Sequence, residues 1–380
     1  MAVFLSSCSD EPSDVGVNLL RDDLVSVKTF DTMDTTVVQN SSYLKKVVPL
    51  GSASRIYIGK RDGLTASTLM RFFFTLDDSL KDDFVNGNIF ITEATIKLTP
   101  KYTFTDETAN LDFTVHKVNN RWSSTNFTAE NLPDLMYDAE DVSFNKDFND
   151  SLYTFNIDTA LVASWLRNSI DTTTATNFGI YYQPTDASGK IVGFQALTAV
   201  SSEAAKIDFV LEKPGSFVDT VQGFIISDVS VVEGDLPTLP QGEIGVQASL
   251  TAQSRLTFDL SFIPKGVVIN SAQLIMTTDT LSSVFGSSFG TDINAFLLGD
   301  TTNVDSVIGT PSVMIKEGDV YLGDVTNIVN SWILGTPNNG FILKPANEVE
   351  GLELFALRGS DFPDSTLRPR LKLVFTERKP

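Results

Sequence analysis

The chain carries few of the side chains on which enzyme chemistry usually depends. Among its 380 residues there is one histidine, His116, and one cysteine, Cys8. A Ser-His-Asp triad would have to use His116, which lies in an alternating segment on the same face as Thr114. We interpret His116 as a surface or interface residue rather than a catalytic base. The single Cys excludes an internal disulfide, and the sequence has neither a Gly-rich phosphate loop nor a His-Glu-x-x-His motif.

Pairs of acidic residues are the second group of candidates, represented by Asp77-Asp78 and Asp82-Asp83. A glycosidase needs two carboxyl groups that face each other about 5–10 Å apart across a sugar, whereas adjacent Asp residues in a turn point apart. We interpret these pairs as solvated loop residues or ligands of a cation. Oxygen ligands for a structural calcium ion occur in two predicted loops: Asp82, Asp83, Asn86 and Asn88, and Asp300, Asn303 and Asp305. We assign no metal site and no other cofactor, and we expect no enzyme activity.

Aromatic side chains are the remaining candidates, because a sugar ring can stack its C–H face on an aromatic ring. Trp165 and Trp332 lie in predicted helices whose apolar face should be buried, so we expect both in the core. Trp122 lies in a polar run and is expected to be exposed. Trp122, Arg121 and Tyr102 form the predicted ligand-binding face, the alternative being a cap packed on the rim of a sandwich. Three further aromatic residues have polar or Gly-rich surroundings: Tyr137, Phe285 and Phe289.

The elements that would position these residues occur twice in the chain. A capped apolar helix that contains Trp165 returns as a helix that contains Trp332, and each is followed by an Asn/Gly turn and a closing alternating strand. Residues 91–98 alternate apolar and polar positions, and residues 269–276 repeat that alternation in the same register. The sequence therefore predicts one architecture used twice.

Short alternating segments, regular turns and one short helix per copy predict an all-β fold. We expect two tandem antiparallel β-sandwiches of the jelly-roll type. The chain is too long for one core, and a Pro/Gly break at residues 213–216 marks the predicted boundary. The predicted domains are residues 1–22 as a signal remnant and acidic tether, residues 23–213 as the first sandwich and residues 214–380 as the second.

Charge and the N-terminal sequence indicate where the protein acts. The chain has 28 Lys and Arg against 48 Asp and Glu, a net charge of −20, which disfavours nucleic acid as a partner. No run reaches the ~18 apolar residues of a membrane-spanning helix. Leu5-Ser6-Ser7-Cys8 resembles a bacterial lipobox and is followed by an acidic tether. We therefore expect lipidation at Cys8, with membrane contact through the lipid anchor only, on the surface of a bacterial outer membrane.

Recurring motifs in both copies resemble the DNRLRE family of jelly-roll modules in extracellular proteins of bacteria and archaea. The matching residues of the first copy are 58–59, 69–72, Ile91, Ala94, Ile96, Leu98, 118–122, 162–165 and 177–179. Those of the second copy are 258–260, Ile269, Ala272, Leu274, 329–332, 339–341 and 368–371. The second copy departs from the pattern, with Thr257 in place of Arg71 and no counterpart of Trp122.

This resemblance implies a β-sandwich fold and, in some relatives, binding of polysaccharides such as alginate. Together with the residues above, it predicts a non-catalytic cell-surface lipoprotein whose partner is a polysaccharide or another extracellular ligand. The alternative is a structural or adhesive subunit that contacts other proteins through its sheet edges.

Overall fold

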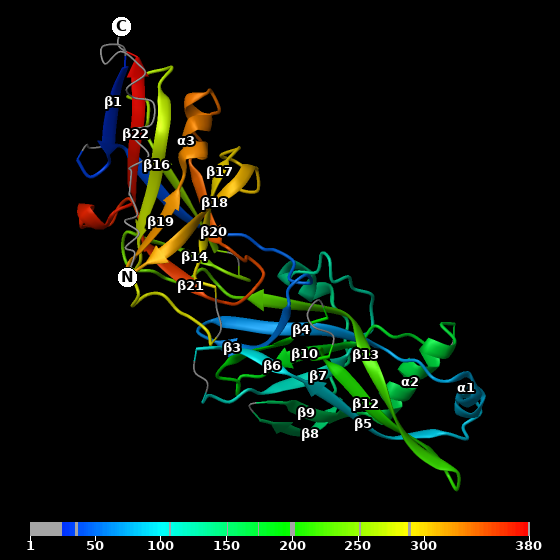
Figure 1. The fold of residues 1–380 in the computed structure, drawn as a ribbon. Coiled ribbons are helices and arrows are strands. Elements are labelled where there is room, and N and C mark those ends of the chain that lie inside the picture. The colour runs from blue at the N-terminus through cyan, green and yellow to red at the C-terminus, as the bar shows by residue number, and fades with distance from the viewer. Residues whose placement is uncertain are drawn as a thin grey trace, which may run out of the picture.

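The computed structural model describes residues 25–34, 37–105, 108–149, 151–173, 175–197, 202–250, 252–287 and 290–378. They form two antiparallel β-sandwiches arranged end to end (Figure 1). The all-β, two-sandwich fold predicted from the sequence is confirmed. None of the described helices is long and apolar enough to cross a membrane.

The first sandwich is built on the strand order β6-β11-β3-β4-β13-β12-β5-β9-β8, and β10 pairs with β4 and β7. The long strand β13 pairs with β12 through its first half and with β4 through its second half, so it joins the two layers. The strands and helices are β3 (Arg55–Arg61), β4 (Leu64–Phe73), α1 (Asp78–Val85), β5 (Phe90–Leu98), β6 (Pro100–Phe104), β7 (Phe113–Lys117), η3 (Ala129–Asp134), β8 (Ser143–Phe148), β9 (Tyr153–Ile157), α2 (Thr159–Ile170), β10 (Ile180–Pro184), β11 (Ile191–Gln195), β12 (Lys206–Lys213) and β13 (Phe217–Glu233).

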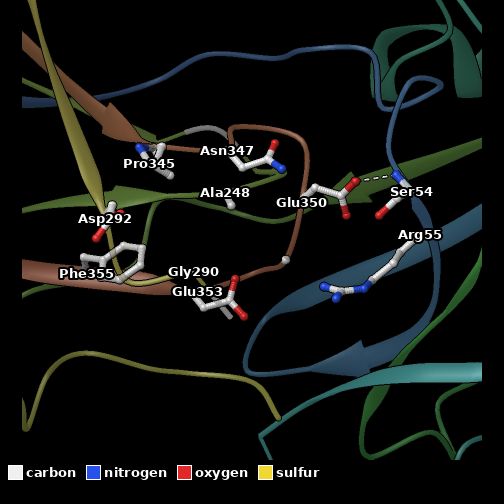
Figure 2. A pocket seen from close by; sticks show the side chains of 12 residues that line it. Ser54, Arg55, Ala248, Gly290, Asp292, Pro345, Asn347, Glu350, Glu353 and Phe355 are labelled. Carbon is white, nitrogen blue, oxygen red and sulfur yellow. Dashed lines mark hydrogen bonds between the residues drawn. The ribbon is translucent and has the colours of Figure 1, made fainter. Parts of the chain in front are cut away.

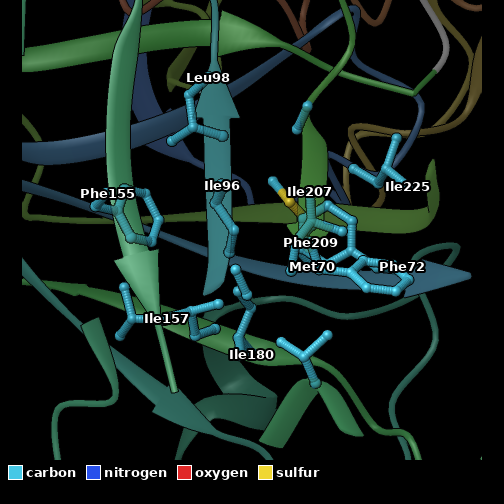
Figure 3. Packing of buried hydrophobic residues seen from close by; sticks show 14 of the residues in the cluster. Met70, Phe72, Ile96, Leu98, Phe155, Ile157, Ile180, Ile207, Phe209 and Ile225 are labelled. Carbon is cyan, nitrogen blue, oxygen red and sulfur yellow. The ribbon is translucent and has the colours of Figure 1, made fainter. Parts of the chain in front are cut away.

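The core of the first sandwich follows from the period-2 alternation of its strands. On β5, Ile96 faces Ile207 of β12 across the ladder, and Ala94 faces Phe209. These side chains and their neighbours fill the space between the layers (Figure 3). Helix α2 covers one end of this core, where Trp165 stacks on Phe74 with ring centroids 6.1 Å apart. Trp165 is 1% exposed, so its predicted core role is confirmed.

The second sandwich repeats the pairing of the first. In sequence order, β14, β15 and β16 correspond to β3, β4 and β5, while β20, β21 and β22 correspond to β10, β11 and β12. Helix α3 takes the place of α2 and buries Trp332, which is 7% exposed. The elements are β14 (Glu243–Gln247), β15 (Ala252–Phe258), β16 (Val268–Thr277), β17 (Ile293–Leu298), β18 (Val307–Glu317), β19 (Val320–Asp324), α3 (Thr326–Ile333), β20 (Phe341–Pro345), β21 (Leu354–Arg358), η4 (Ser365–Leu367) and β22 (Arg370–Arg378).

Local irregularities recur at matching positions, which supports the duplication. The ladder between β5 and β12 skips Thr92, and the ladder between β16 and β22 skips Asn270. The amide of Asn177 donates to the Phe72 carbonyl at 2.8 Å, and that of Asn338 donates to Phe258 at 2.8 Å. Asn338 is therefore the counterpart of Asn177, one residue earlier than the motif match indicates.

Glycine is required two residues after each of these Asn side chains. Gly179 and Gly340 both have positive φ, and a Cβ atom on either would collide with the backbone carbonyl of the neighbouring strand. The turn that follows each helix thus has the same conformational requirement in both sandwiches.

The strands that close the sandwiches are exchanged between the two halves, which the sequence did not predict. Strand β1 (Val25–Asp31) pairs with β22, and β2 (Gln39–Lys45) pairs with β15, so both belong to the second sandwich. Figure 1 shows β1 in blue beside β22 in red. Strand β13 closes the first sandwich. The predicted boundaries are wrong at both places: strands within residues 23–213 join the second sandwich, and residues 213–216 form the turn of the β12–β13 hairpin.

A mixed apolar cluster joins the two sandwiches. Tyr57, Tyr102 and Phe104 of the first pack with Leu250 and Leu352 of the second. Two tyrosine hydroxyls accept hydrogen bonds from the loop before β21: Tyr57 from the Gly351 N–H at 2.6 Å, and Tyr102 from the Leu352 N–H at 3.1 Å. Packing and buried hydrogen bonds together fix this loop against the first sandwich.

Candidate functional site

The three residues of the predicted ligand-binding face do not form one surface. Trp122 and Arg121 line a surface hollow of about 390 Å³ with polar neighbours that include Asn126 and Asn131. Tyr102 is 2% exposed and lies in the cluster between the sandwiches. The expectation that Tyr102 contacts ligand is therefore wrong, because β6 turns its ring inward. Cys8 and Phe289 lie outside the described residues.

Trp122 has a structural task that its sequence surroundings did not reveal. Its indole Nε1 donates to the carbonyl of Phe178 at 2.7 Å, and its ring packs beside a small apolar cluster of the first sandwich. The matching carbonyl in the second sandwich belongs to Asn339, which accepts from the guanidinium of Arg255 at 3.0 Å. Both sandwiches thus brace the same turn, one with an indole and the other with a guanidinium. This is the rim packing left open as the alternative.

His116 is buried rather than at the surface. It is 5% exposed, and its Nε2 lies 2.7 Å from the hydroxyl of Thr114. Its Nδ1 lies 3.0 Å from the carbonyl oxygens of both Asp138 and Glu140. Both ring nitrogens are therefore occupied by neighbours that hold the loop before β8. The remaining aromatic candidates also have neighbours: Tyr137 contacts the His116 ring, and Phe285 contacts Phe355.

Three of the four acidic residues near residue 80, Asp78, Asp82 and Asp83, lie in helix α1, and Asp77 directly precedes it. Asp83 binds Lys213 and accepts from the Asn88 amide at 3.1 Å, and Asp78 pairs with Lys81 at 2.6 Å. The expectation of a loop is wrong here, because Asp77 precedes a helical segment that ends at Val85. Asp77, Asp78 and Asp82 are nevertheless exposed, as expected of solvated residues. Within the described ranges, no three His, Cys, Asp or Glu side chains are grouped so as to hold a metal ion.

A larger cavity, of about 630 Å³, lies where the two sandwiches meet (Figure 2). The first sandwich contributes Ser54 and Arg55, which precede and begin β3. The second contributes the loop between β20 and β21, with its acidic residues Glu350 and Glu353. Phe355 and Pro345 supply apolar wall, and Asp292 and Asn347 add polar groups. The site exists only when both sandwiches are in place.

Two carboxylate oxygens in this cavity have no hydrogen-bond partner among the described residues: Oε2 of Glu350 and Oε1 of Glu353. Glu353 is 3% exposed, and burial raises the pKa of its carboxyl group. The other Glu350 oxygen accepts from the Ser54 N–H, so the interface holds that side chain in place. Both unpaired oxygens are themselves buried, so each missing hydrogen bond has a free-energy cost in the folded protein.

Tyr102 contacts two residues that line this cavity, Glu353 and Arg55. Its hydroxyl is hydrogen-bonded to Glu353, and the guanidinium of Arg55 lies 5.6 Å from the centre of its ring. Tyr102 therefore contacts both the Arg55 guanidinium and the Glu353 carboxyl group but does not itself line the cavity. The predicted residue was relevant to a site, but as a support for other residues.

The cavity is suited to bind a ligand that donates hydrogen bonds. The side chains of Glu350 and Glu353 supply carboxylates, and Arg55 supplies a cation from the opposite sandwich (Figure 2). Hydroxyl groups donate to carboxylates and accept from a guanidinium, so a polyol satisfies both. Sequence reasoning missed Arg55, Glu350 and Glu353. The one available signal was three Glu residues around a Gly at residues 348–353, which by itself is typical of a solvated loop.

A second buried acidic group lies at the equivalent end of the second sandwich. Glu243 takes the ladder position that corresponds to Arg55, and it faces Arg358 of β21. Arg358 binds Glu243 and also Asp279, the latter at 3.2 Å. Burial raises the pKa of Glu243 to about 7, while the pKa of Asp279 is lowered by the hydrogen bonds that it accepts. This cluster is internal to one sandwich and is not part of the cavity.

Comparison with known proteins adds no assignment: no family model and no curated protein matches this chain.

Proposed function

We propose that the protein is a non-catalytic, cell-surface lipoprotein that binds a neutral, hydroxyl-rich polysaccharide in the cavity between its sandwiches. The observation that carries the proposal is the grouping of two acidic side chains, Glu350 and Glu353, with the guanidinium-bearing Arg55 around one cavity. Sugar hydroxyls can donate to carboxylates and accept from a guanidinium. The resemblance to DNRLRE modules, some of which bind polysaccharides, supports a polysaccharide ligand but not its neutral charge.

The charge of the protein favours a neutral glycan over an acidic one. The chain has a net charge of −20, and three of the polar side chains around the cavity are carboxylic acids: Asp292, Glu350 and Glu353. A uronic-acid polymer would bring further carboxylates to this wall, where like charges repel. The lipobox-like sequence at Cys8 supports a location on the outer membrane surface, where such a polymer is accessible.

Affinity electrophoresis through gels that contain defined polysaccharides tests the proposal. We expect a neutral glucan, mannan or xylan to retard the wild-type protein. The Glu353→Gln variant keeps the size of the side chain but removes one acceptor and the charge, and should weaken retardation by about tenfold, the loss of one charge-assisted hydrogen bond. Glu243→Gln, a matched change outside the cavity, should bind as the wild type does.

The same gels separate the cavity from the hollow at Trp122. Retardation that survives Trp122→Ala and is lost in Glu353→Gln supports the cavity. Loss in Trp122→Ala with an unchanged Glu353→Gln variant would move the site to the hollow lined by Arg121 and Trp122. A protein that no glycan retards would contradict the proposal.

A second candidate function, a structural subunit that contacts other proteins, is favoured by an exposed apolar patch on the first sandwich. Phe73 of β4 and Phe224 of β13 are cross-strand partners, 45% and 53% exposed, and the nearby Ile226 is 42% exposed. Exposed groups of large apolar side chains often mark protein contacts. Sedimentation analysis of Phe224→Ser tests this candidate: it predicts that the wild type self-associates through this patch and that the variant does so less.

A further inference from the structure

The two halves of the chain are each preceded by a lead strand that closes the opposite sandwich. Strands β1 and β2 precede the first half and pair with β22 and β15. Strand β13 precedes the second half and pairs with β12 and β4, which are the counterparts of β22 and β15. The closing strands therefore occupy equivalent positions but are supplied crosswise.

The two closing strands differ in how the chain connects them to their sandwich. A tight turn at residues 213–216 joins β13 to β12, so β13 cannot leave its neighbour without opening a hairpin. The chain connects β2 to the first sandwich through the linker at residues 46–54, which lies between β2 and β3. The position of β1 and β2 is thus maintained by their contacts and not by an adjacent turn.

Those contacts are specific and lie almost entirely within the second sandwich. Strand β1 forms a seven-residue ladder with β22, and Asp31 accepts two hydrogen bonds from Arg370, one of them at 2.7 Å. The Leu371 N–H donates to the Thr32 hydroxyl at 3.0 Å. The rings of Phe30 and Phe262 are 4.5 Å apart. A second copy of the chain carries the same lead strands and can make each of these contacts.

We infer that β1 and β2 exchange between copies of this chain, so that the lead strands of one copy close the second sandwich of another. The partner is a second copy because the acceptor edge already binds that exact sequence, with a defined register and a matched ion pair. Exchange of an identical element between copies needs no new interface. If the protein is anchored at a surface, as proposed above, neighbouring copies are crowded together. Their β1 and β2 strands then compete more effectively with the chain's own β1 and β2 for the second sandwich.

Cysteine trapping between separately prepared variants tests this inference. In a Cys8→Ser background, one protein carries Thr29→Cys and the other carries Val374→Cys, positions that face each other in the β1–β22 ladder. We expect a disulfide-linked heterodimer when the two proteins are mixed and oxidised. Its fraction should rise about tenfold for a tenfold rise in protein concentration while the dimer is the minor species.

The hairpin of the first sandwich supplies the matched control. Val210→Cys and Thr220→Cys face each other between β12 and β13. The double variant should form a disulfide within one chain, and mixing the two single variants should give no heterodimer. If the Thr29→Cys and Val374→Cys proteins also give none at any concentration, while their double variant is trapped within one chain, the inference is overturned.

Reversing the charges of the Asp31–Arg370 ion pair gives a second, independent test of strand exchange that uses no cysteine in the β1–β22 ladder. Asp31→Arg and Arg370→Asp each place like charges together within their own chain. A mixture allows the lead strands of the first variant to pair correctly with the second sandwich of the second variant. We expect sedimentation to show heterodimers in the mixture and fewer oligomers in either variant alone; equal behaviour of the mixture and the single variants would count against exchange.

Discussion

The two sandwiches have the same interior but different closing edges. In the first, β13 is a continuous strand of 17 residues, and it buries Ile225, Val229 and Val231. In the second, β1 and β2 contribute seven residues each, and none of their described side chains is fully buried. The β5–β12 ladder of the first sandwich and the β16–β22 ladder of the second have the same register, including one skipped residue on β5 and on β16. The duplicated sequence therefore determines the cores, while each edge depends on where its closing strand comes from.

The largest effect should come from the aromatic residue that each helix contributes to the core. Trp165→Ala and Trp332→Ala should each lower the free energy of unfolding by about 3–5 kcal/mol, the usual cost of removing a buried Trp. Trp165 should be the more costly, because it stacks on Phe74 and is almost fully buried. Urea unfolding measures both. A loss below about 1 kcal/mol in either variant would break the equivalence of the two helices.

The closing strands should differ in what they contribute to stability. Ile225→Ala on β13 removes a side chain that is 4% exposed and should cost about 3 kcal/mol. Phe30→Ala on β1 removes a ring that is only partly buried against the second core, and should cost about 1 kcal/mol. Urea unfolding with hydrogen exchange on the two strands compares them. Equal losses would mean that both edges are held equally firmly.

Each sandwich should lose stability over its own pH range. Burial raises the pKa of Asp228 in β13 from 3.8 to about 6, and that of Glu243 in β14 from 4.5 to about 7. Folding raises the pKa of each of these carboxyl groups. Below the pKa of the group in the unfolded chain, its full contribution to stability is present. That contribution is lost as the pH rises to the pKa of the group in the folded protein. The loss is on the order of 3 kcal/mol for each group. It should fall between pH 3.8 and 6 for Asp228, and between pH 4.5 and 7 for Glu243.

Isosteric variants assign these pH ranges. Asp228→Asn should abolish the loss over the lower range, and Glu243→Gln should abolish it over the higher one, as measured by urea unfolding at a series of pH values. Wild-type stability that rises with pH over both ranges, with no change in the variants, would contradict the assignment of raised pKa values.

The smallest effect should come from the two braces of the turn after each helix. Trp122→Phe removes the indole donor to Phe178, and Arg255→Met removes the guanidinium donor to Asn339. Each loss of a hydrogen bond should lower the free energy of unfolding by about 1 kcal/mol. Thermal unfolding of both variants provides the measurement. A large loss in Trp122→Phe alone would show that the indole and the guanidinium are not equivalent supports.

The sequence was sufficient for the repeated core but not for the strand exchange or the site. Alternation at Ile96 and Leu274 predicts which face of each strand is buried, because that depends only on local periodicity. The pairing of β1 with β22 joins Val25 to Arg378, and no local pattern carries information over that separation. The prediction that Tyr102 belongs to a ligand-binding face was wrong because its polar neighbours in sequence gave no sign that a second sandwich would cover it. The cavity needs both sandwiches, so Arg55 and Glu353 could not be connected by spacing.

Disulfide mapping at high dilution tests the crosswise closure most directly. In a Cys8→Ser background, Val27→Cys combined with Thr376→Cys should give a monomer with an internal disulfide, because these positions face each other between β1 and β22. Val27→Cys combined with Val210→Cys should stay reduced, because β13 covers that edge of β12. The opposite pattern, a disulfide to β12 and none to β22, would mean that each half is closed by its own lead strand and would contradict the account.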